Sequence, residues 1–227
     1  RRYRNVQEAM NTWRDYMVSM GFGYKLGIDL PGEKRGLIPN AAFYDKAYKG
    51  SWNGLTIISI AIGQGEVNLT PLQIANLSAT IANRGYYYIP HVVRKVQGEP
   101  LDTLYRRRHY TKASREAYEY VVEGMRASVV GGTCHAANRA DYLVCGKTGT
   151  AQNRGQDHSV FMGFAPMENP KIAIAVYVEN GGFGATYGVP IGSLMMEQYI
   201  NGKLSAFSEA QASVFQSRRI AYGTSNR

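Results

Sequence analysis

The sequence predicts an α+β fold of the α/β-sandwich type, in which helices flank an antiparallel sheet. Segments 160–165 and 172–178 are apolar, and the turn Pro166-Met167-Glu168-Asn169-Pro170 joins them too tightly for a crossover, so they are antiparallel strands. Apolar residues recur every three or four positions over 6–20 and 113–130, which predicts two amphipathic helices. The chain has 227 residues, 44% of them hydrophobic, which suffices for one domain with a sizeable core.

The first half of the chain contains a helix, a long loop and a second helix with a clear start. Residues 27–55 carry Pro, Gly and charges without periodicity, which predicts a loop that could line a cleft. A helix then begins after Thr70, because its hydroxyl suits the N-cap, Pro71 suits the first helical position and Gln73 completes a capping box. The residues expected to face the core are Leu72, Ala75, Ala79 and Ala82. Gly63-Gln64-Gly65 predicts a tight turn leading into this helix, with an active-site wall as the alternative.

The second half contains the sheet and its covering helices. Strand 160–165 is apolar on both faces, as expected of a central strand covered by helices. Branched residues in 172–178 alternate with Ala173, Ala175 and Tyr177, and the two alanines let a helix approach their face. Pro190 opens a final helix through Ile200, which ends at Gly202. We expect the domain to span residues 1–204 and residues 205–227 to form a mobile tail.

The segment Cys145-Gly146-Lys147-Thr148-Gly149-Thr150-Ala151-Gln152 is the most informative, because it places a lysine, two hydroxyls and a glycine on one predicted strand edge. Extended residues alternate faces, so the edge must twist to bring the hydroxyls of Thr148 and Thr150 toward a cleft. Gly149 lets another backbone come close. Such an edge can hold an anionic acyl substrate, although an ordinary polar edge strand remains the alternative.

Nucleotide and nucleic-acid binding are both disfavoured. Gly146-Lys147-Thr148 would end a phosphate-binding loop only if a glycine stood at position 141, where the chain has Asp141. The net charge of +9 and the run Arg106-Arg107-Arg108-His109 invite a test for nucleic acid, but the other basic residues are dispersed and no nucleic-acid motif is present. Solvated faces, or attraction to anionic lipid and wall polymer, explain the charge.

The cysteines Cys134 and Cys145 leave three interpretations open. They could form a disulfide in an oxidising compartment, or remain as two buried thiols. With His135 and His158 they could bind a metal, but their spacing fits no zinc template. We expect neither a metal nor a cofactor.

The lysine strand and the segments around it resemble class B penicillin-binding proteins, and within them the penicillin-binding protein 2 group. The resemblance runs from Gly21 to about Leu204 and includes the blocks Gly27–Glu33, Trp52–Gln73 and His158–Pro166. Leu55 stands where the second block usually has Asp. Division-specific relatives remain an alternative to the elongation-specific group.

This resemblance implies a serine-type D,D-transpeptidase that cross-links peptidoglycan stem peptides through an acyl-serine and binds β-lactams. Lys147 would supply positive charge and belong to the proton network, Thr148, Gly149 and Thr150 would bind the substrate, and the Thr150 backbone N–H would be one oxyanion-hole donor. No serine of the chain has lysine three positions later, so the Ser-x-x-Lys nucleophile is absent from this chain. Ser51-Trp52-Asn53 matches the Ser-x-Asn motif but belongs to the tryptophan block.

The missing nucleophile predicts a fragment that is inactive alone. The chain starts at Arg1 without methionine, signal peptide or apolar span, so we expect a truncated or nicked product of a protein anchored by an N-terminal helix at the periplasmic face of the bacterial inner membrane. Its expected partners are the missing N-terminal part and a cell-wall polymerase complex. Two upstream strands would normally pair beside 171–180, so the fragment should cover that edge by dimerising, by swapping or by holding its other half.

Two other functions share the lysine strand. A β-lactamase or β-lactam sensor would carry it, but such domains usually lack the Gly27–Glu33 block and the Gly63-Gln64-Gly65 turn. A parent protein that had lost its serine would be a non-catalytic binding module of the wall-synthesis complex.

Overall fold

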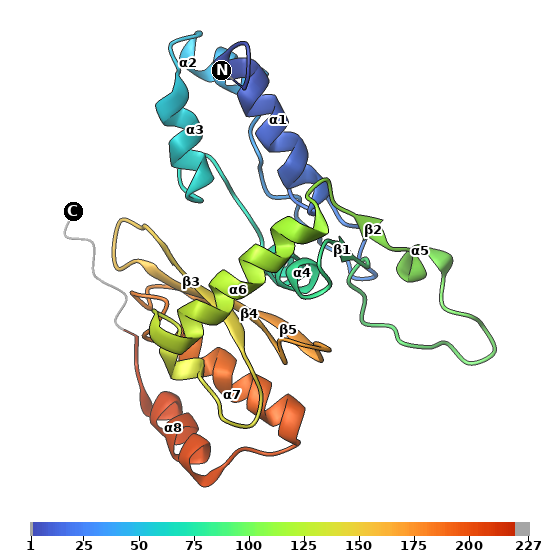
Figure 1. Ribbon diagram of the computed structural model, residues 1–227, viewed down its shortest axis with the longest axis vertical. Coiled ribbons are helices and arrows are strands. Elements are labelled where there is room, and N and C mark those ends of the chain that lie inside the picture. Colours follow the sequence, from blue (N-terminus) through green and yellow to red (C-terminus); the bar gives the residue numbers. More distant parts are fainter. Residues whose placement is uncertain (1, 221–227) are drawn as a thin grey trace. The chain divides into compact units, whose positions relative to one another are not determined.

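A computed structural model describes residues 2–220 of the chain, which divides into two compact units (Figure 1). Unit 1 comprises Arg1–Thr80 and Gly85–Ser114, and unit 2 comprises Ile81–Arg84 and Arg115–Arg227. That residues 1–204 form one domain stays a prediction. Among the described residues, no helix has the length and apolar character needed to cross a membrane.

Unit 1 consists mainly of short helices around a small core. Its elements are α1 (Val6–Ser19), α2 (Ala41–Tyr48), α3 (Gly54–Ala61), α4 (Pro71–Ala82, whose last turn passes into unit 2), β1 (Tyr86–Tyr87), α5 (Thr103–Arg106) and β2 (His109–Tyr110). The core contains Met10, Ala41, Tyr44, Trp52 and Ile60. Helix α1 confirms the first predicted helix.

The prediction of a long loop over residues 27–55 was wrong, because α2 lies within this range and α3 begins at Gly54. Asparagine side chains start both helices: Asn40 accepts a hydrogen bond from the Phe43 N–H at 2.8 Å, and Asn53 accepts one from the Leu55 N–H at 2.9 Å. Both are good N-cap residues.

Helix α4 begins with the predicted capping box but buries a different face. Thr70 and Gln73 exchange the two reciprocal hydrogen bonds, at 3.1 and 3.2 Å. The buried Gln73 amide also donates to the carbonyls of Gly21, Tyr24 and Arg35. Asn76 and Thr80 are buried beside it, whereas Leu72, Ala75 and Ala79 are only half-buried and Ala82 is buried as predicted. The core-facing side of α4 is therefore largely polar, because it satisfies backbone groups of the preceding loop.

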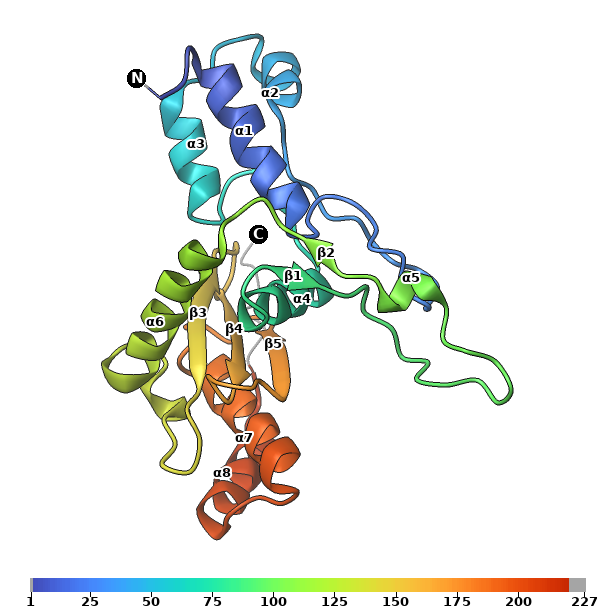
Figure 2. The same cartoon turned by 45° about the vertical axis from the view of Figure 1, so that its right-hand side comes forward.

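Unit 2 is built on a three-stranded antiparallel sheet in the order β3-β4-β5, which confirms the predicted fold class and strand pairing. Its elements are α6 (Arg115–Gly131), the 3₁₀ turn η1 (His135–Ala137), β3 (Cys145–Ala151), β4 (His158–Ala165), β5 (Ile172–Val178), α7 (Gly188–Asn201) and α8 (Ala206–Ser217). Helix α6 packs against β3, and α7 packs against β4 and β5 (Figure 2). Helices α6 and α7 confirm the predictions for 113–130 and 190–200.

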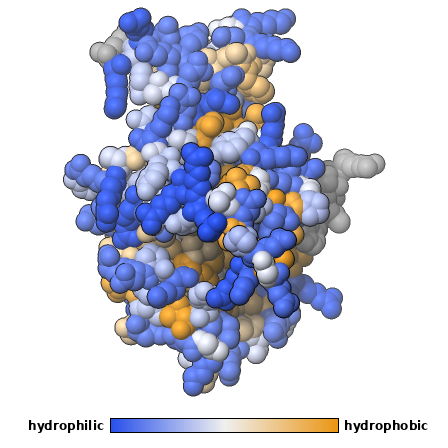
Figure 3. Space-filling model, turned by 90° about the vertical axis from the view of Figure 1, so that its right-hand side faces the viewer, coloured by the Kyte–Doolittle hydropathy of each residue, from blue (hydrophilic) through white to orange (hydrophobic). Residues whose placement is uncertain are grey.

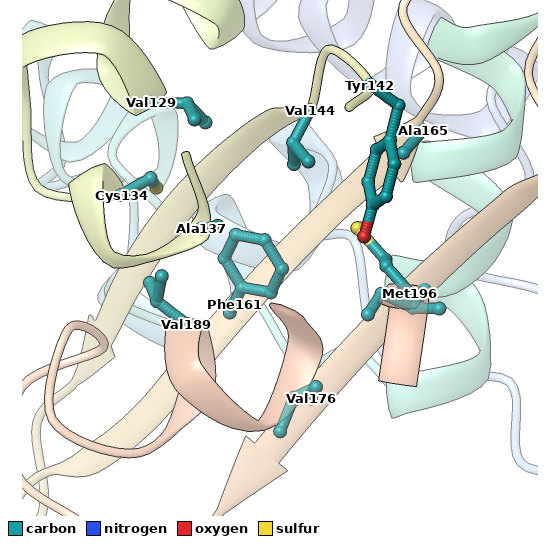
Figure 4. Packing of buried hydrophobic residues seen from close by; sticks show 11 residues of the cluster. Val129, Cys134, Ala137, Tyr142, Val144, Phe161, Ala165, Val176, Val189 and Met196 are labelled. Atoms are coloured by element: carbon teal, nitrogen blue, oxygen red, sulfur yellow. The ribbon is translucent and has the colours of Figure 1, made fainter. Parts of the chain in front are cut away.

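Phe161 lies at the centre of the unit 2 core, fully buried among side chains from the sheet, α7 and η1 (Figure 4). Three glycines leave the space that its ring occupies, and a fourth lies against its Cβ. A Cβ at Gly146, Gly163 or Gly192 would lie 2.5–2.7 Å from the ring, and one at Gly188 would lie 3.0 Å from the Phe161 Cβ. Real Cβ atoms do not approach so closely, so the glycines are a requirement of this packing.

Apolar side chains also remain exposed in both units, among them Leu55, Ile58 and Ile62 in unit 1 and Met195 and Tyr199 in unit 2. Figure 3 shows orange areas of hydrophobic residues on a mostly hydrophilic surface. Strand β5 has a neighbour on one side only among the described strands. That this edge is covered by dimerisation, by swapping or by the other half of the protein stays a prediction.

Residues 205–220 of the expected tail contain α8, and residues 221–227 lie outside the described residues. Ser205 caps α8, and its N–H donates to the Glu197 carboxylate of α7 at 2.9 Å. The same carboxylate accepts hydrogen bonds from the Ser208 hydroxyl and, at 2.7 Å, from Arg139. Glu197 thus joins three segments of unit 2. The domain boundary at residue 204 and the mobility of the tail stay predictions.

This cluster should make the stability of unit 2 depend on pH. Burial alone would raise the pKa of Glu197, but hydrogen bonds from Arg139, Ser208 and Ser205 outweigh it and lower the pKa from 4.5 to about 2. Because the folded-state pKa is lowered, the stabilisation is complete above pH 4.5 and is lost as the pH falls toward 2. We expect Glu197→Gln to lower the free energy of unfolding by about 2 kcal/mol at pH 7, and this difference should shrink below pH 4.5.

Urea unfolding at a series of pH values measures this difference. The matched control is Glu209→Gln in α8, since Glu209 is exposed and should give no comparable difference at any pH. A difference for Glu197→Gln that stays constant from pH 7 to pH 3 would show that the charge of Glu197 is not what stabilises the unit.

Candidate functional site

The residues Lys147, Thr148, Gly149 and Thr150 lie together on β3, which pairs with β4 only and is therefore an edge strand among the described residues. Lys147 is exposed, and its ammonium donates to the carbonyl of Thr148 at 2.8 Å. The other three residues are half-buried. The strand thus presents a cation, two hydroxyls and a free backbone edge on one accessible segment.

The segment between β5 and α7 lies directly on β3. A Cβ at Gly184 would be 2.5 Å from the Val160 carbonyl oxygen, 2.8 Å from that of Gly149 and 2.9 Å from the Thr148 Cβ, so only glycine fits there. We predicted that Gly149 admits another backbone, and the segment at Gly184 does approach its carbonyl. A Cβ on Gly149 itself, however, would meet the Val160 side chain at 3.3 Å. The close approach depends on Gly184, which the sequence analysis did not single out.

Ser159 holds this segment in place. Its side chain is buried on β4, and its residue pairs with Thr150 across the sheet. The Ser159 hydroxyl donates to the Phe183 carbonyl at 2.8 Å and accepts from the Gly188 N–H at 3.1 Å. Since both hydroxyl bonds go to the backbone of the 183–188 segment, Ser159 sets the position of that segment beside the lysine strand.

The β3–β4 loop is tied to the residues after β5. The Asn180 N–H donates to His158 Nδ1 at 3.0 Å, the Asn153 amide donates to the Asn180 side chain at 3.1 Å, and the Gly182 N–H donates to the Asp157 carbonyl at 2.8 Å. The two loops that frame the C-terminal end of β3 therefore support each other. His158 contributes to this support as the hydrogen-bond acceptor of the Asn180 N–H.

Both cysteines are buried and unbonded, which supports the interpretation as two buried thiols. Burial raises the pKa of the Cys145 thiol to about 11, so it is neutral at pH 7 and unsuited to nucleophilic attack. Within residues 2–220, no group of three or more His, Cys, Asp or Glu side chains is arranged to hold a metal ion. The site can therefore offer charge and hydrogen bonds, while its thiol stays inert.

The other conspicuous motifs of the sequence have structural contacts within unit 1. Asn53 caps α3, and the Trp52 indole donates to Asp45 at 2.6 Å. Glu33 accepts the backbone N–H groups of residues 26–28. Gly63 and Gly65 have positive φ where α3 ends, and the Gly63 N–H donates to the Ile60 carbonyl. This turn terminates α3, so the prediction that it leads directly into α4 was wrong.

Within the basic run at residues 106–108, Arg108 packs locally. The Arg108 guanidinium lies 4.6 Å from the centre of the Tyr86 ring, and its Nε donates to the Tyr88 hydroxyl at 3.0 Å. These contacts give Arg108 a structural role in unit 1.

Comparison with known proteins places this geometry in a family. The sequence pattern of the family described as "Penicillin binding protein transpeptidase domain" matches residues 5–197. The chain is 36% identical over 198 residues to the peptidoglycan D,D-transpeptidase MrdA of Acinetobacter baumannii, covering 79% of this chain and 29% of that protein. It is 29% identical over 231 residues to the MrdA protein of Haemophilus influenzae, covering 91% of this chain and 35% of that protein. The chain thus spans about a third of the length of these curated relatives.

Solved structures of similar proteins show the same fold. Pseudomonas aeruginosa PBP2 in complex with WCK 5153 matches with a TM-score of 0.77 and 33% identity, over 88% of this chain and 45% of that one. Helicobacter pylori PBP2 in complex with MreC matches with a TM-score of 0.69 and 27% identity, over 88% of this chain and 37% of that one. The similarity extends over both the sequence and the arrangement of the elements.

Proposed function

Because the chain belongs to the penicillin-binding protein transpeptidase domain family, we propose that it supplies the lysine-strand part of a peptidoglycan D,D-transpeptidase site of the penicillin-binding protein 2 type. The serine of an upstream Ser-x-x-Lys motif attacks the D-Ala-D-Ala end of a stem peptide and releases D-alanine. A neighbouring stem amine then takes the acyl group, and β-lactams acylate the same serine. The observation that carries this proposal is the cluster Lys147-Thr148-Gly149-Thr150 on the accessible edge strand β3.

Each residue of the strand has a distinct task. The Thr148 and Thr150 hydroxyls donate hydrogen bonds to the substrate carboxylate, and the Lys147 ammonium contributes positive charge there and takes part in the proton network. Gly149, which has no side chain, leaves the strand open to the bound peptide. The Thr150 backbone N–H donates to the oxygen that becomes negative in the tetrahedral intermediate, and the second oxyanion donor belongs to the nucleophile's own segment.

The wider setting of the proposed enzyme follows its relatives. Solved structures of similar proteins include a complex with MreC and a peptidoglycan synthase complex that coordinates polymerisation and cross-linking. We propose that the longer protein is anchored at the periplasmic face of the inner membrane, that it works with such a polymerase complex, and that its role is in elongation. Within it, the upstream part of the same protein would cover the free edge of β5.

Covalent labelling by a fluorescent penicillin tests the proposed division of the site. The protein is exposed to the probe in its folded state, and its intact mass is then measured under denaturing conditions. The isolated 227-residue chain should show no gain in mass. A longer protein that includes the upstream segment should gain one penicilloyl group, on the serine of its Ser-x-x-Lys motif. Covalent label on the isolated chain would contradict the proposal, because the chain would then carry a nucleophile of its own.

The lifetime of the acyl-protein separates the related activities. A transpeptidase should keep the label for a long time in water and transfer the acyl group of a stem peptide to an added amine. Rapid hydrolysis of the label would identify a β-lactamase instead, and failure of the longer protein to label would identify a non-catalytic binding module.

A further inference from the structure

A threonine outside the lysine strand contacts the hydroxyl that the proposed site uses. Thr133 follows the end of α6, and its Oγ1 lies 2.8 Å from the Thr148 Oγ1 on β3. The two residues are 15 positions apart in sequence, so the contact comes from the tertiary fold. No sequence pattern points to Thr133.

The turn that carries Thr133 is held rigidly. The N–H groups of Gly132 and Cys134 both donate to the Ser128 carbonyl at 3.1 Å, and a Cβ on Gly132 would lie 2.9 Å from the backbone of Ser128. Cys134 is fully buried in the unit 2 core. Thr133 is therefore fixed between a glycine that admits no side chain and a cysteine anchored in the core.

Thr148 is restrained on its other sides as well. The Thr148 Cβ lies 2.9 Å from the position that a Cβ would take at Gly184, and Thr148 pairs with Phe161 on β4. Its carbonyl accepts the Lys147 ammonium at 2.8 Å. The backbone of Thr148 is thus fixed, but the direction of its hydroxyl proton depends on the partner of its oxygen.

We propose that Thr133 is a positioning residue for Thr148, an inference that rests on the proposed function. A carboxylate only accepts hydrogen bonds, so Thr148 must donate its single hydroxyl proton to bind one. If Thr133 donates to the Thr148 oxygen, the Thr148 proton is directed away from Thr133 and toward the substrate. The two hydroxyls then form a chain that ends on the carboxylate, in which each hydrogen bond strengthens the next.

The test uses the longer protein with its acylatable serine, and measures pre-covalent dissociation constant and acylation rate constant separately. The variants are Thr133→Val, which keeps the shape but lacks the hydroxyl, and Thr133→Ser, which retains it. A benzylpenicillin with a free carboxylate is compared with its neutral methyl ester. The control is Thr103→Val, because the Thr103 hydroxyl donates, among the described residues, to Asp102 alone, at 3.4 Å in unit 1.

Thr133→Val should raise the dissociation constant of the free acid about three- to tenfold and leave that of the ester nearly unchanged. Thr133→Ser and Thr103→Val should behave like the unaltered protein. A general folding defect would weaken the binding of both compounds equally, so it cannot produce this pattern. Equal effects on acid and ester, or no effect on either, would overturn the inference while leaving the proposed function intact. If the unaltered protein is not acylated at all, the proposed function fails and the inference fails with it.

Discussion

Replacing Gly192 by alanine is expected to lower the free energy of unfolding of unit 2 by about 3 kcal/mol. A Cβ at this position in α7 would lie 2.5 Å from the Phe161 Cδ1 and 2.6 Å from its Cε1. The ring cannot move aside, because Gly146 and Gly163 border it equally closely elsewhere. The helix or the sheet must therefore shift, and the tight contacts of the unit 2 core are lost with it.

The matched control is Gly124→Ala, which also changes a helical glycine of unit 2. A Cβ at Gly124 in α6 meets nothing within 4 Å, so only the helix propensity changes, and alanine should stabilise the unit by about 0.5–1 kcal/mol. In urea unfolding monitored by circular dichroism, the two substitutions should thus shift the unfolding midpoint in opposite directions. Phe161→Leu should recover part of the loss in the Gly192→Ala background. Midpoints that shift in the same direction would show that Phe161 does not limit the space at Gly192.

Local signals explain which elements could be predicted. The start of α4 depends on Thr70, Pro71 and Gln73, which lie within four residues of one another, and their hydrogen bonds form as the sequence indicates. Strands β4 and β5 are joined by the six residues 166–171, which leaves only an antiparallel arrangement. In both cases the interacting residues are close in sequence, so the pattern contains the physical cause.

The errors arise where the cause lies elsewhere in the chain. Helix α3 is mostly apolar without a clear period of 3.6, and its N-cap Asn53 was assigned to the tryptophan block and not recognised as a helix start. Gln73 faces inward because carbonyls of Gly21, Tyr24 and Arg35 need a donor, which no periodicity reveals. Thr133 likewise gains its significance only when the fold brings it to Thr148. The lysine strand itself was evident, but the residues that support it come from three other segments.

In the longer protein, Lys147→Ala should lower the second-order rate constant of acylation by penicillin about 10²–10³-fold, the loss typical of a preorganised electrostatic group. The effect should not come from unfolding, because the Lys147 side chain is exposed and its ammonium bonds only to the adjacent Thr148 carbonyl among the hydrogen bonds described. Lys171→Ala is the matched control, since Lys171 is another exposed lysine of unit 2, next to β5. Stopped-flow acylation of the unaltered protein, Lys147→Ala and Lys171→Ala measures the effect, after their melting temperatures have been shown to be equal. A normal rate for Lys147→Ala would remove Lys147 from the site.

Lys147→Arg then separates the two tasks assigned to the lysine. Arginine keeps the positive charge, so the carboxylate should still be attracted and the pre-covalent dissociation constant should remain within about threefold of the unaltered protein. A guanidinium does not give up a proton near neutral pH, so it cannot take part in proton transfer, and the acylation rate constant should stay about as low as in Lys147→Ala. If arginine restores the rate constant as well, Lys147 contributes charge alone, and the proton that leaves the serine must be carried entirely by groups upstream of this chain.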